Sequence, residues 1–490
     1  MIASHLPALQ VVVPLVAAPV CVLLRWSRVA WMVAMAASLF AVGGAWCLLA
    51  GVLSAGPTSY FLGSWAAPWG IEYRVDETNA WVMLVVSVIS AVSLLFARRS
   101  VEREVETDRI HLFYTAWLLC LAGLLGMAVT ADAFNVFVFL EISSLSTYVL
   151  VSLGTRREAL VAALRYLVLG TVGATFFLIG VGLLYQVTGT LNMGDLATRI
   201  AQLGPHRTVT AAFGFLAVGI AVKSAVYPLH TWLPNAYAFA PSAVSAFLAG
   251  TATKVSLYLL LRFLFTVFGH EFVAGGPVPV LLALTGVAAV VAASVAAVRQ
   301  DDAKRLLGFS SVAQIGYLVL GVSLLTTEGV AASLIHLFGH ALMKTALFVC
   351  LGAIVYRIGS ARIDDMAGIA KRMPWTCAAL VVGGLSLIGV PLTAGFVGKW
   401  YLVAAALEAG WWPVAAAMLL ASLIAVAYVW KLVESAYFRA PSARVAAARE
   451  APFSMVAAAW GLSGANIWFG IDTSLPIGVA NRAAAALLGG

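Results

Sequence analysis

Residues 221–256 read AVKSAVYPLHTWLPNAYAFAPSAVSAFLAGTATKVS, and they place two lysines, Lys223 and Lys254, in apolar surroundings. A polar segment between them contains His230 and Pro228, and the proline removes a backbone hydrogen-bond donor. An ammonium group near the centre of a bilayer costs about 2.5 to 3.5 kcal/mol, so a lysine in such a place usually belongs to an ion path. This stretch therefore predicts a broken membrane helix at the centre of the fold.

The rest of the chain has the composition of a membrane protein. Hydrophobic residues make up 62% of the 490 residues, and charged residues only 10%, against roughly 25% in soluble domains. Apolar segments of about 20 residues recur throughout, and each can cross a hydrocarbon core of about 30 Å as a helix. We therefore expect an all-α polytopic membrane protein that forms a single integral membrane domain over residues 1–490.

The apolar segments predict about fourteen transmembrane helices. Their approximate bounds are 2–24, 29–54, 79–97, 110–130, 133–153, 159–185, 208–229, 241–268, 277–298, 306–326, 329–356, 374–408, 411–438 and 451–471. Between spans, residues 57–78 predict a small external hairpin, and residues 190–203 predict an amphipathic surface helix. The first span lacks a basic leader and a cleavage site, so it is expected to be a retained helix.

Basic residues are unevenly divided between alternate loops. One set of loops holds 18 of them, and the other holds only Arg74, Arg199, Arg207 and Arg482. The positive-inside rule puts the richer set in the cytoplasm, which predicts a multi-pass protein of the cell (inner) membrane with both termini outside the cytoplasm. The basic residues are scattered and not clustered beside aromatic residues, so nucleic acid is not an expected partner. The five cysteines have no metal-ligand spacing, and no metal site is expected.

Eight titratable residues are predicted to lie inside spans or at their breaks. They are Glu141, Lys223, His230, Lys254, His336, His340, Lys344 and Lys399. His336, His340 and Lys344 are spaced by four, which places them on one face of a helix. Exposure of the five normally charged residues to lipid would cost on the order of 15 kcal/mol, so these residues must be paired, hydrated or neutral.

This set of residue types suits proton movement. Burial disfavours the charged form of Lys223 and an adjacent carboxylate favours it, so movement of Glu141 would switch the lysine between binding and releasing a proton. A series of Lys223, Lys254, His336 and Lys399, joined by water, would carry the proton across the core. Histidine suits an intermediate position because imidazole takes up and releases protons near neutral pH.

Structural explanations remain open at this point for several of these residues. Glu141 and Lys223 could form an ion pair that only holds two helices together. Lys344 could extend to the cytoplasmic interface, and His230 could cap a helix end. On that view the chain would be a membrane anchor that conducts nothing.

The two halves of the chain show a hint of symmetry. Lys223 and Lys399 each lie beside a proline-containing interruption in a late span of a group of five spans. Transporters with inverted repeats build a site at the membrane midplane from two broken helices in this way. The expected repeats are residues 110–268 and residues 277–438.

Five segments resemble the proton-conducting antiporter-like family shared by Mrp-type cation/proton antiporters, respiratory complex I and membrane-bound hydrogenases. They are FNVFVFLEISSLSTYVLVSLG, KSAVYPLHTWLPNAYAFAPSAVSAFLAGTATK, DDAKRLLGFSSVAQIGYLVLG, LIHLFGHALMKTALF and GVPLTAGFVGKWYL. The resemblance covers roughly residues 110–430, in the family's order. It implies fourteen transmembrane helices with two inverted five-helix repeats and with broken seventh and twelfth helices.

The resemblance also implies roles for individual residues. Glu141 matches the family's fifth-helix glutamate, which modulates the seventh-helix lysine, here Lys223. Lys254 matches the eighth-helix lysine and His336 the eleventh-helix histidine. Lys399 matches the twelfth-helix lysine, which faces the exit. His230, His340 and Lys344 are expected to be accessory polar residues.

The retained Lys254 and the segment SAVSAFLAGTATKV look most similar to the D-type subunit of Mrp antiporters, whereas LLGFSSVAQIGYL is equally close to complex I subunits. The expected function is proton translocation within a multi-subunit Mrp-type monovalent cation (sodium)/proton antiporter. The alternative is a proton-pumping, antiporter-like subunit of a complex I-like NADH-quinone oxidoreductase or of a membrane-bound hydrogenase. Expected partners are other hydrophobic subunits of a membrane complex, protons, sodium and the lipid bilayer. No cofactor and no catalytic residue of its own is expected.

Overall fold

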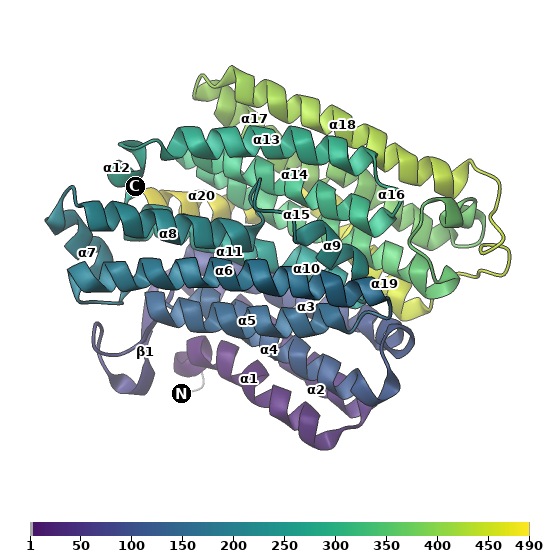
Figure 1. Ribbon diagram of the computed structural model, residues 1–490, viewed down its shortest axis with the longest axis horizontal. Coiled ribbons are helices and arrows are strands. Elements are labelled where there is room, and N and C mark those ends of the chain that lie inside the picture. Colours follow the sequence, from purple (N-terminus) through teal and green to yellow (C-terminus); the bar gives the residue numbers. More distant parts are fainter. Residues whose placement is uncertain (1–2, 490) are drawn as a thin grey trace.

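The computed structural model describes residues 3–489 as a bundle of helices with one small hairpin (Figure 1). Among these residues, twelve helical segments are long and apolar enough to cross a membrane. They are α1 (Leu6–Leu24), α2 (Ser27–Ala55), α3 (Glu77–Glu104), η3 (Thr107–Arg109) with α4 (Ile110–Val129), α5 (Ala133–Ser152), α6 (Arg157–Thr188), α8 (Arg207–Ser224), α10 (Ser242–Gly250) with α11 (Ala252–Leu261) and the π-helix η4 (Arg262–Val267), α13 (Val278–Val298), α14 (Ala303–Ser323), α15 (Thr327–Ile358) and α18 (Trp412–Tyr437). Each coincides with one of the predicted spans, so the all-α polytopic membrane fold is confirmed.

The predicted span at 374–408 is divided into two helices, α16 (Pro374–Ile388) and α17 (Ala394–Glu408). Each has 15 residues, too few to cross a bilayer alone. Gly389 follows α16 with a φ of 94°, a left-handed conformation that favours glycine. The two short helices together therefore make one interrupted crossing.

The last crossing is also divided and is longer than the predicted span of 451–471. α19 (Phe453–Ile471) is followed by α20 (Ser474–Leu488), which the sequence analysis did not predict. A Cβ on Gly470 would lie 2.4 Å from the Leu392 carbonyl carbon, so α19 ends beside the interruption between α16 and α17. α20 continues to the end of α2, where Arg482 Nη1 donates to the Leu53 carbonyl over 2.9 Å. A half-crossing of 15 residues is too short for a search that looks for whole spans.

The shorter elements gather at the two ends of the bundle. β1 (Thr58–Phe61) and β2 (Glu72–Val75) form the predicted antiparallel hairpin, and α7 (Met193–Leu203) is the predicted amphipathic helix. The other short elements are α9 (Leu233–Phe239), α12 (His270–Ala274), η1 (Ala3–His5), η2 (Leu62–Ser64), η5 (Asp364–Met366) and η6 (Ile369–Lys371). The hairpin, α7, α12, the start of α1 and the end of α20 lie at one end, which we call the terminal end (Figure 1). The opposite end holds the loops rich in Arg and Lys, and we call it the basic end.

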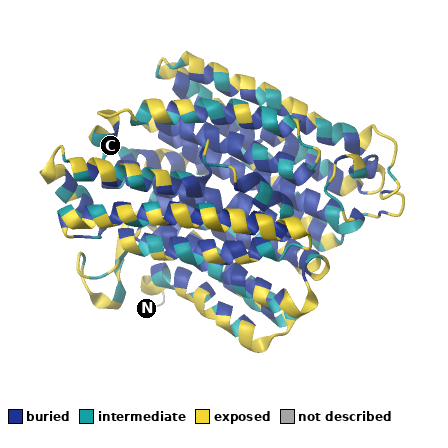
Figure 2. Ribbon diagram, viewed as in Figure 1, coloured by how far each residue is buried: buried dark blue, intermediate teal, exposed yellow. Residues whose placement is uncertain are grey.

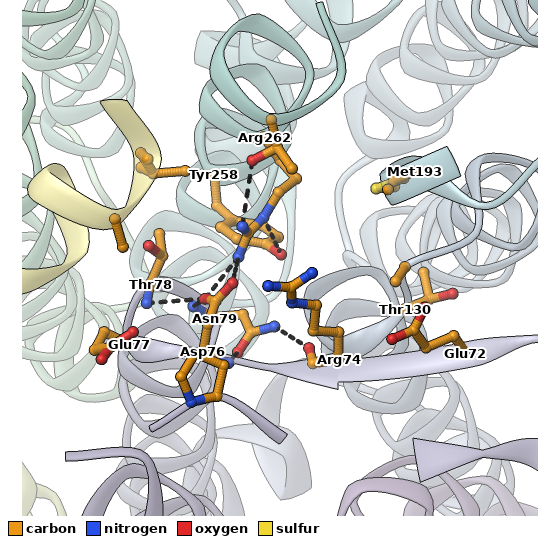
Figure 3. Close-up of a pocket in the computed structure, with 16 residues that line it drawn as sticks. Glu72, Arg74, Asp76, Glu77, Thr78, Asn79, Thr130, Met193, Tyr258 and Arg262 are labelled. Carbon is orange, nitrogen blue, oxygen red and sulfur yellow. Dashed lines mark hydrogen bonds and ion pairs between the residues drawn. The ribbon is translucent and has the colours of Figure 1, made fainter. Parts of the chain in front are cut away.

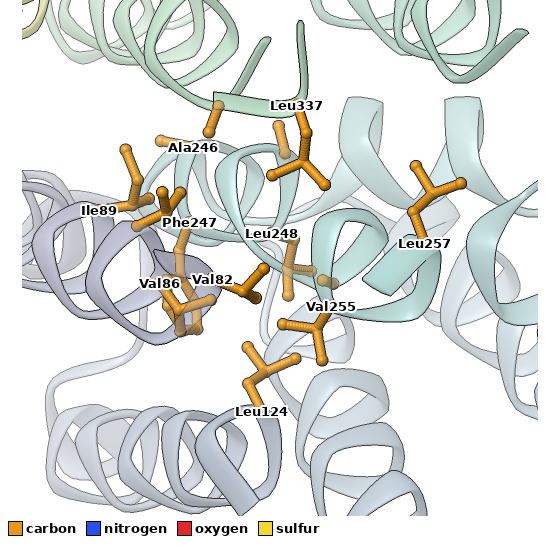
Figure 4. Packing of buried hydrophobic residues seen from close by; sticks show 14 of the residues in the cluster. Val82, Val86, Ile89, Leu124, Ala246, Phe247, Leu248, Val255, Leu257 and Leu337 are labelled. Carbon is orange, nitrogen blue, oxygen red and sulfur yellow. The ribbon is translucent and has the colours of Figure 1, made fainter. Parts of the chain in front are cut away.

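Burial separates inner helices from outer ones (Figure 2). α14, α15 and the segment from α10 to η4 are buried on nearly all sides, whereas α1, α6, α13 and α18 leave one apolar face exposed. Such exposed apolar faces are expected where helices meet lipid or another membrane protein. α10 and α11 pack their apolar side chains between α3, α4 and α15 (Figure 4), and Phe247 of α10 stacks on Trp117 of α4 with ring centroids 4.2 Å apart.

Small residues bring α6 and α8 into close contact. A Cβ on Gly219 of α8 would lie 2.6 Å from the carbonyl oxygen of Gly173 in α6. Close approach of backbones through glycine is a common packing mode of membrane helices. This contact sets the distance between the end of α8, which carries Lys223, and the facing part of α6.

Candidate functional site

The first interruption follows Lys223. α8 ends at Ser224, Ala225 is left-handed with a φ of 55°, and the chain resumes as a helix only at Leu233. Trp232 holds the interruption in place, since its indole Nε1 donates to the Val222 carbonyl over 2.9 Å. The predicted break of the seventh helix is therefore present, a few residues before the predicted end of that span.

Lys223 is buried and is held by hydroxyl groups from two neighbouring helices. Its Nζ donates to Ser144 Oγ of α5 over 2.6 Å and to the Tyr166 hydroxyl of α6 over 3.3 Å. The Tyr166 ring in turn stacks on Trp232, with centroids 3.8 Å apart and planes 4° from parallel. The sequence analysis named neither Ser144 nor Tyr166.

Glu141 lies one helical turn before Ser144 on α5 and is half-buried. Its Oε1 is buried without a hydrogen-bond partner, and Glu141 forms no ion pair with Lys223 or with any other cation among residues 3–489. The explanation of this pair as a fixed structural ion pair is therefore wrong. A carboxylate without a fixed partner, close to a lysine that hydroxyl groups hold, suits a modulating role.

Lys254 lies just after an interruption that the sequence analysis missed. α10 ends at Gly250 and α11 begins at Ala252, with Thr251 at φ −126° and ψ −62° between them. The Lys254 ammonium is fully buried and donates to the Ala249 carbonyl, which the break leaves without its helical partner, and to Thr253 Oγ1 over 3.4 Å. The expected continuous eighth span is in fact interrupted, and a backbone carbonyl at the break binds the buried lysine.

The face of α15 that carries His336, His340 and Lys344 is buried against other helices. His336 Nε2 lies 3.0 Å from Gln314 Oε1 of α14. Lys344 Nζ donates to two further groups of α14, Ser310 Oγ and, over 2.9 Å, the Leu307 carbonyl. Lys344 is 0% exposed, so it does not extend to the cytoplasmic interface, and that alternative is wrong.

His340 is the least satisfied of these side chains. Its ring lies parallel to that of His336, with centroids 6.2 Å apart, and neither of its ring nitrogens has a hydrogen-bond partner within residues 3–489. Buried polar groups without partners are rare in folded proteins. Both ring nitrogens are therefore free to bond water.

The second proline-containing interruption positions Lys399. Its Nζ donates to the carbonyls of Leu387 and Ile388, over 2.9 and 3.0 Å, and to Ser422 Oγ of α18 over 3.1 Å. The two carbonyls are free because α16 ends at Ile388. The predicted break of the twelfth helix therefore supplies the ligands of its own lysine.

Tyr317 of α14 lies between the histidine and lysine groups. Its ring centroid is 5.7 Å from that of His336 and 4.8 Å from Lys399 Nζ. The Tyr317 hydroxyl donates to the Met418 carbonyl over 2.6 Å and lies 2.9 Å from Ser422 Oγ. The structure thus brings His336 and Lys399 together through one tyrosine that the sequence analysis did not name.

α17 approaches α15 closely at His336. A Cβ on Gly398 would lie 2.6 Å from His336 Cα and 2.8 Å from its Nδ1. Nε2 of His336 faces Gln314, so the unpartnered Nδ1 of His336 faces α17. Lys399 is the residue that follows Gly398 in that helix. Gly398 therefore leaves room for the His336 ring against α17.

His230 lies in the interruption after α8, stacked on Tyr227 with centroids 5.0 Å apart. It does not cap α9, whose first residues have no side-chain cap, and its Nδ1 is buried without a partner. Its ring edge faces Phe309 of α14 at 6.4 Å between centroids. His230 therefore belongs to the first interruption and faces α14. It is not one of the residues that bond the four buried lysines.

A polar stripe runs along α11 towards the terminal end. Lys254, Tyr258 and Arg262 are spaced by four, and Arg262 Nη2 contacts both oxygens of Asp76, at 2.6 and 2.5 Å (Figure 3). This ion pair borders a cavity of about 130 Å³. The pair is nearly buried and ties the start of the π-helix η4 to the start of α3.

The missed residues carried one usable signal. Gln314 and the hydroxyl residues of EISSLS interrupt otherwise apolar spans, and polar residues in membrane helices usually face a partner. Tyr166 and Ser422 carried none, because only the packing of distant helices brings them to a lysine.

Comparison with known proteins agrees with this geometry. Residues 130–425 match a family model described as NADH:quinone oxidoreductase/Mrp antiporter, TM. The N-type subunit of the NADH-quinone oxidoreductase of Desulforudis audaxviator is 41% identical over 442 residues, which cover 89% of this chain and 87% of that protein. The D-type subunit of the Na⁺/H⁺ antiporter of Alkalihalophilus pseudofirmus is 32% identical over 351 residues, which cover 72% of this chain and 70% of that one.

A solved structure shows the same architecture. The chain superimposes on one chain of the Mrp complex from Dietzia sp. DQ12-45-1b with a TM-score of 0.91 and 26% sequence identity, covering 100% of this chain and 98% of that chain. This agreement extends over the interrupted helices as well as the outer ones. The protein is therefore a multi-pass integral membrane protein that belongs to the antiporter-like membrane subunits of the NADH:quinone oxidoreductase and Mrp antiporter family.

Proposed function

We propose that this chain is the proton-translocating subunit of a multi-subunit Mrp-type monovalent cation/proton antiporter, with sodium as the exchanged cation. One observation carries the proposal. Lys223, Lys254, Lys344 and Lys399 are buried in the bundle, and within residues 3–489 none of them forms an ion pair with a carboxylate. Buried lysines that only hold helices together are expected to be paired, because an unpaired buried charge is costly.

The proton would move between these groups through water. In the first half, Lys223 exchanges a proton with neighbouring groups while Glu141, which has no fixed partner, sets how readily it does so. From Lys254 the proton would pass to His336 and then, beside Tyr317, to Lys399. His230, His340 and Lys344 would act as accessory polar groups that hold water along the way.

The proposed repeats are residues 110–268 and residues 277–438. Each contains a proline-containing interruption next to a buried lysine: Lys223 precedes the one in the first repeat, and Lys399 follows the one in the second. A proton path that crosses from one repeat to the other would use α15, which packs against helices of both halves. The proposed arrangement thus makes α15 the link between two similar half-channels.

The proposed setting is the cell (inner) membrane, with both termini outside the cytoplasm. The position of the basic loops at the end opposite to α1's start and α20's end supports this orientation. The exposed apolar faces of α1, α6, α13 and α18 would contact lipid and the other hydrophobic subunits of the complex. Protons and sodium are the proposed transported ions.

A second candidate is a proton-pumping subunit of a complex I-like NADH-quinone oxidoreductase or of a membrane-bound hydrogenase. The 41% identity to an N-type oxidoreductase subunit over 89% of the chain favours it. Both candidates use the same buried residues and differ in the partners. Purification of the intact complex distinguishes them: hydrophobic antiporter subunits support the first, and iron–sulfur proteins support the second.

The test of conduction uses the complex in inverted membrane vesicles. Lys223→Ala and Glu141→Ala are introduced, and sodium-dependent proton movement is followed with a pH-sensitive dye, while co-purification of the partner proteins checks assembly. Loss of proton movement in an assembled complex supports the proposal. Normal proton movement in both variants would mean that the chain is a membrane anchor.

A further inference from the structure

The basic end of the bundle contains a cavity of about 720 Å³. The ends of α3, α9 and α15 border it, together with the loops before α6 and α14. Seven basic and four acidic residues line it, which gives a difference of three positive charges. This volume lies within the range of about 300–1,000 Å³ that is usual for sites of small molecules.

The four acidic residues of this cavity already have partners. The contacts are Glu104 with the Ser242 amide (2.8 Å), Asp302 with the Arg305 amide (2.9 Å), Asp301 with Lys431 (3.2 Å) and Asp365 with Arg444 (3.5 Å). Two of these contacts are at helix starts, where a carboxylate satisfies backbone N–H groups. The carboxylates are therefore committed to other groups.

Most of the basic residues of the cavity are not neutralised in this way. Apart from Arg156, which pairs with Glu158, and Arg444, the basic lining residues form no ion pair among residues 3–489. These unpaired basic residues are Arg103, Arg299, Lys304, Arg305 and Arg362. The lining as a whole has three more cations than carboxylates, which creates a positive potential that attracts an anion.

Two of these five residues, Lys304 and Arg305, have few hydrogen-bond partners in the protein. Lys304 is only 4% exposed, and its Nζ has a single protein partner, the Ala240 carbonyl at 3.2 Å. Arg305 has a buried Nε without any hydrogen-bond partner. A buried donor left without an acceptor is unfavourable, so an anion that reached both groups would be stabilised.

The rim consists of exposed arginines on different loops. Arg299 precedes α14, Arg362 follows α15, and Arg103 ends α3 with its guanidinium over the Tyr356 ring at 5.1 Å. The positive-inside bias explains why this end is basic. It does not explain why these side chains surround one cavity while the acidic side chains in the same wall already have partners.

We propose that this cavity binds a phosphate-bearing anion, supplied either by the headgroup of an anionic phospholipid or by a water-soluble phosphate compound. Guanidinium groups match the oxygen atoms of phosphate in pairs, and such charge-assisted bonds are about twice as strong as neutral ones. The start of α14 adds a favourable helix dipole. The bound anion would join segments from both halves of the chain, because α3 and α9 lie in the first half and α14 and α15 in the second.

The test measures binding of two probes to the purified full-length protein. Radiolabelled inorganic pyrophosphate is the soluble probe, and nanodiscs of phosphatidylcholine with or without phosphatidylglycerol are the lipid probe. The variant is Arg299→Gln with Arg362→Gln, which removes two exposed cations of the rim. The matched control is Arg25→Gln with Arg28→Gln, which removes two exposed cations from the same end, outside the cavity.

The rim variant is expected to bind the effective probe at least about tenfold more weakly, and the control within about twofold of the unmodified protein. Binding of pyrophosphate identifies a soluble ligand, and selective binding of phosphatidylglycerol alone identifies a lipid headgroup. The proposal is overturned if neither probe binds, or if the rim variant and the control bind alike. If the double variant does not fold, Arg299→Gln is measured alone with Arg28→Gln as its control.

Discussion

The two proline-containing interruptions hold their lysines by different means. At the first, Lys223 is bonded to Ser144 and Tyr166, side-chain hydroxyls that come from other helices. At the second, Lys399 is bonded to two carbonyls of its own interrupted span and to one hydroxyl, that of Ser422. Glu141 accompanies the first lysine, and no carboxylate contacts the second within the described residues.

This difference separates a lysine that can be adjusted from one that is fixed. The surroundings of Lys223 depend on how α5, α6 and α8 lie relative to one another, so a small shift of one helix changes its bonds. The carbonyls around Lys399 move only if the interruption itself changes. We infer that control of proton movement acts mainly at Lys223, and that Lys399 offers a constant receiving site.

The largest expected effect follows removal of the adjustable lysine. Lys223→Ala should lower proton movement by about 100-fold or more, the usual loss when a positioned proton-transfer group is removed. Dye-monitored proton uptake in inverted vesicles measures it. Lys431→Ala is the matched control, because that lysine lies near the basic end and is bonded to loop carbonyls and Asp301. Equal rates in both variants would contradict the proposed path.

The next effect tests the passage between the two regions. Gly398→Ala would place a methyl group 2.6 Å from His336 Cα, so α15 and α17 must separate. A displaced histidine should reduce proton movement by about tenfold, and overpacking should lower the free energy of unfolding by about 1–3 kcal/mol.

Gly464→Ala in α19 serves as the control for this prediction. A Cβ at Gly464 meets nothing within 4 Å, so transport and stability should stay near those of the unmodified protein. Thermal unfolding of the purified variants and the vesicle assay measure the two effects. A Gly398→Ala protein with unchanged rate would show that the close approach at His336 is unimportant.

A moderate effect is expected from loss of one hydroxyl at the adjustable lysine. Ser144→Ala removes the 2.6 Å bond to Lys223 and leaves only the longer bond to Tyr166. A typical intramolecular hydrogen bond contributes about 0.5–1.5 kcal/mol net, so proton movement should change by roughly two- to tenfold. Rates measured across a pH series should also show a shifted optimum, which a purely structural serine would not produce.

The smallest effect is expected from the equivalent change at the fixed lysine. Ser422→Ala leaves both carbonyl bonds of Lys399 in place, so the rate should change by less than about twofold. The pair of serine variants therefore tests the comparison directly. A larger effect for Ser422→Ala than for Ser144→Ala in the same vesicle assay would reverse the assignment of adjustable and fixed sites.

Local sequence was enough to locate the spans and two of the interruptions. Pro228 and Pro391 remove backbone donors inside apolar segments, and lysines in such segments are conspicuous. The interruption at Thr251 was missed because Gly250 and Thr251 are tolerated inside many membrane helices, and there only the tertiary structure decides the outcome. α20 was missed because its 15 residues are too few to count as a crossing.

The partners of the lysines were less predictable than the lysines. Ser144, Tyr166, Tyr317 and Ser422 come from helices far apart in the sequence, and their approach depends on packing contacts such as the one between Gly173 and Gly219. Of the candidate proton-transfer residues, Lys223, Lys254, His336 and Lys399 are buried in the bundle, and Glu141 is half-buried. Their proposed order along the path still rests on the experiments above.

The division of the last crossing into α19 and α20 has a practical consequence for anyone who modifies this chain. Because α20 borders the cavity near Asp76 through Ala486 and Leu487, its residues belong to the folded body and not to a dispensable tail. Truncation after Ile471 would keep α19 but remove α20. The chain would then end inside the membrane, and the faces of α3 and α15 that α20 covers would be exposed to lipid. Affinity tags and fluorescent fusions should therefore follow a linker placed after the last turn of α20.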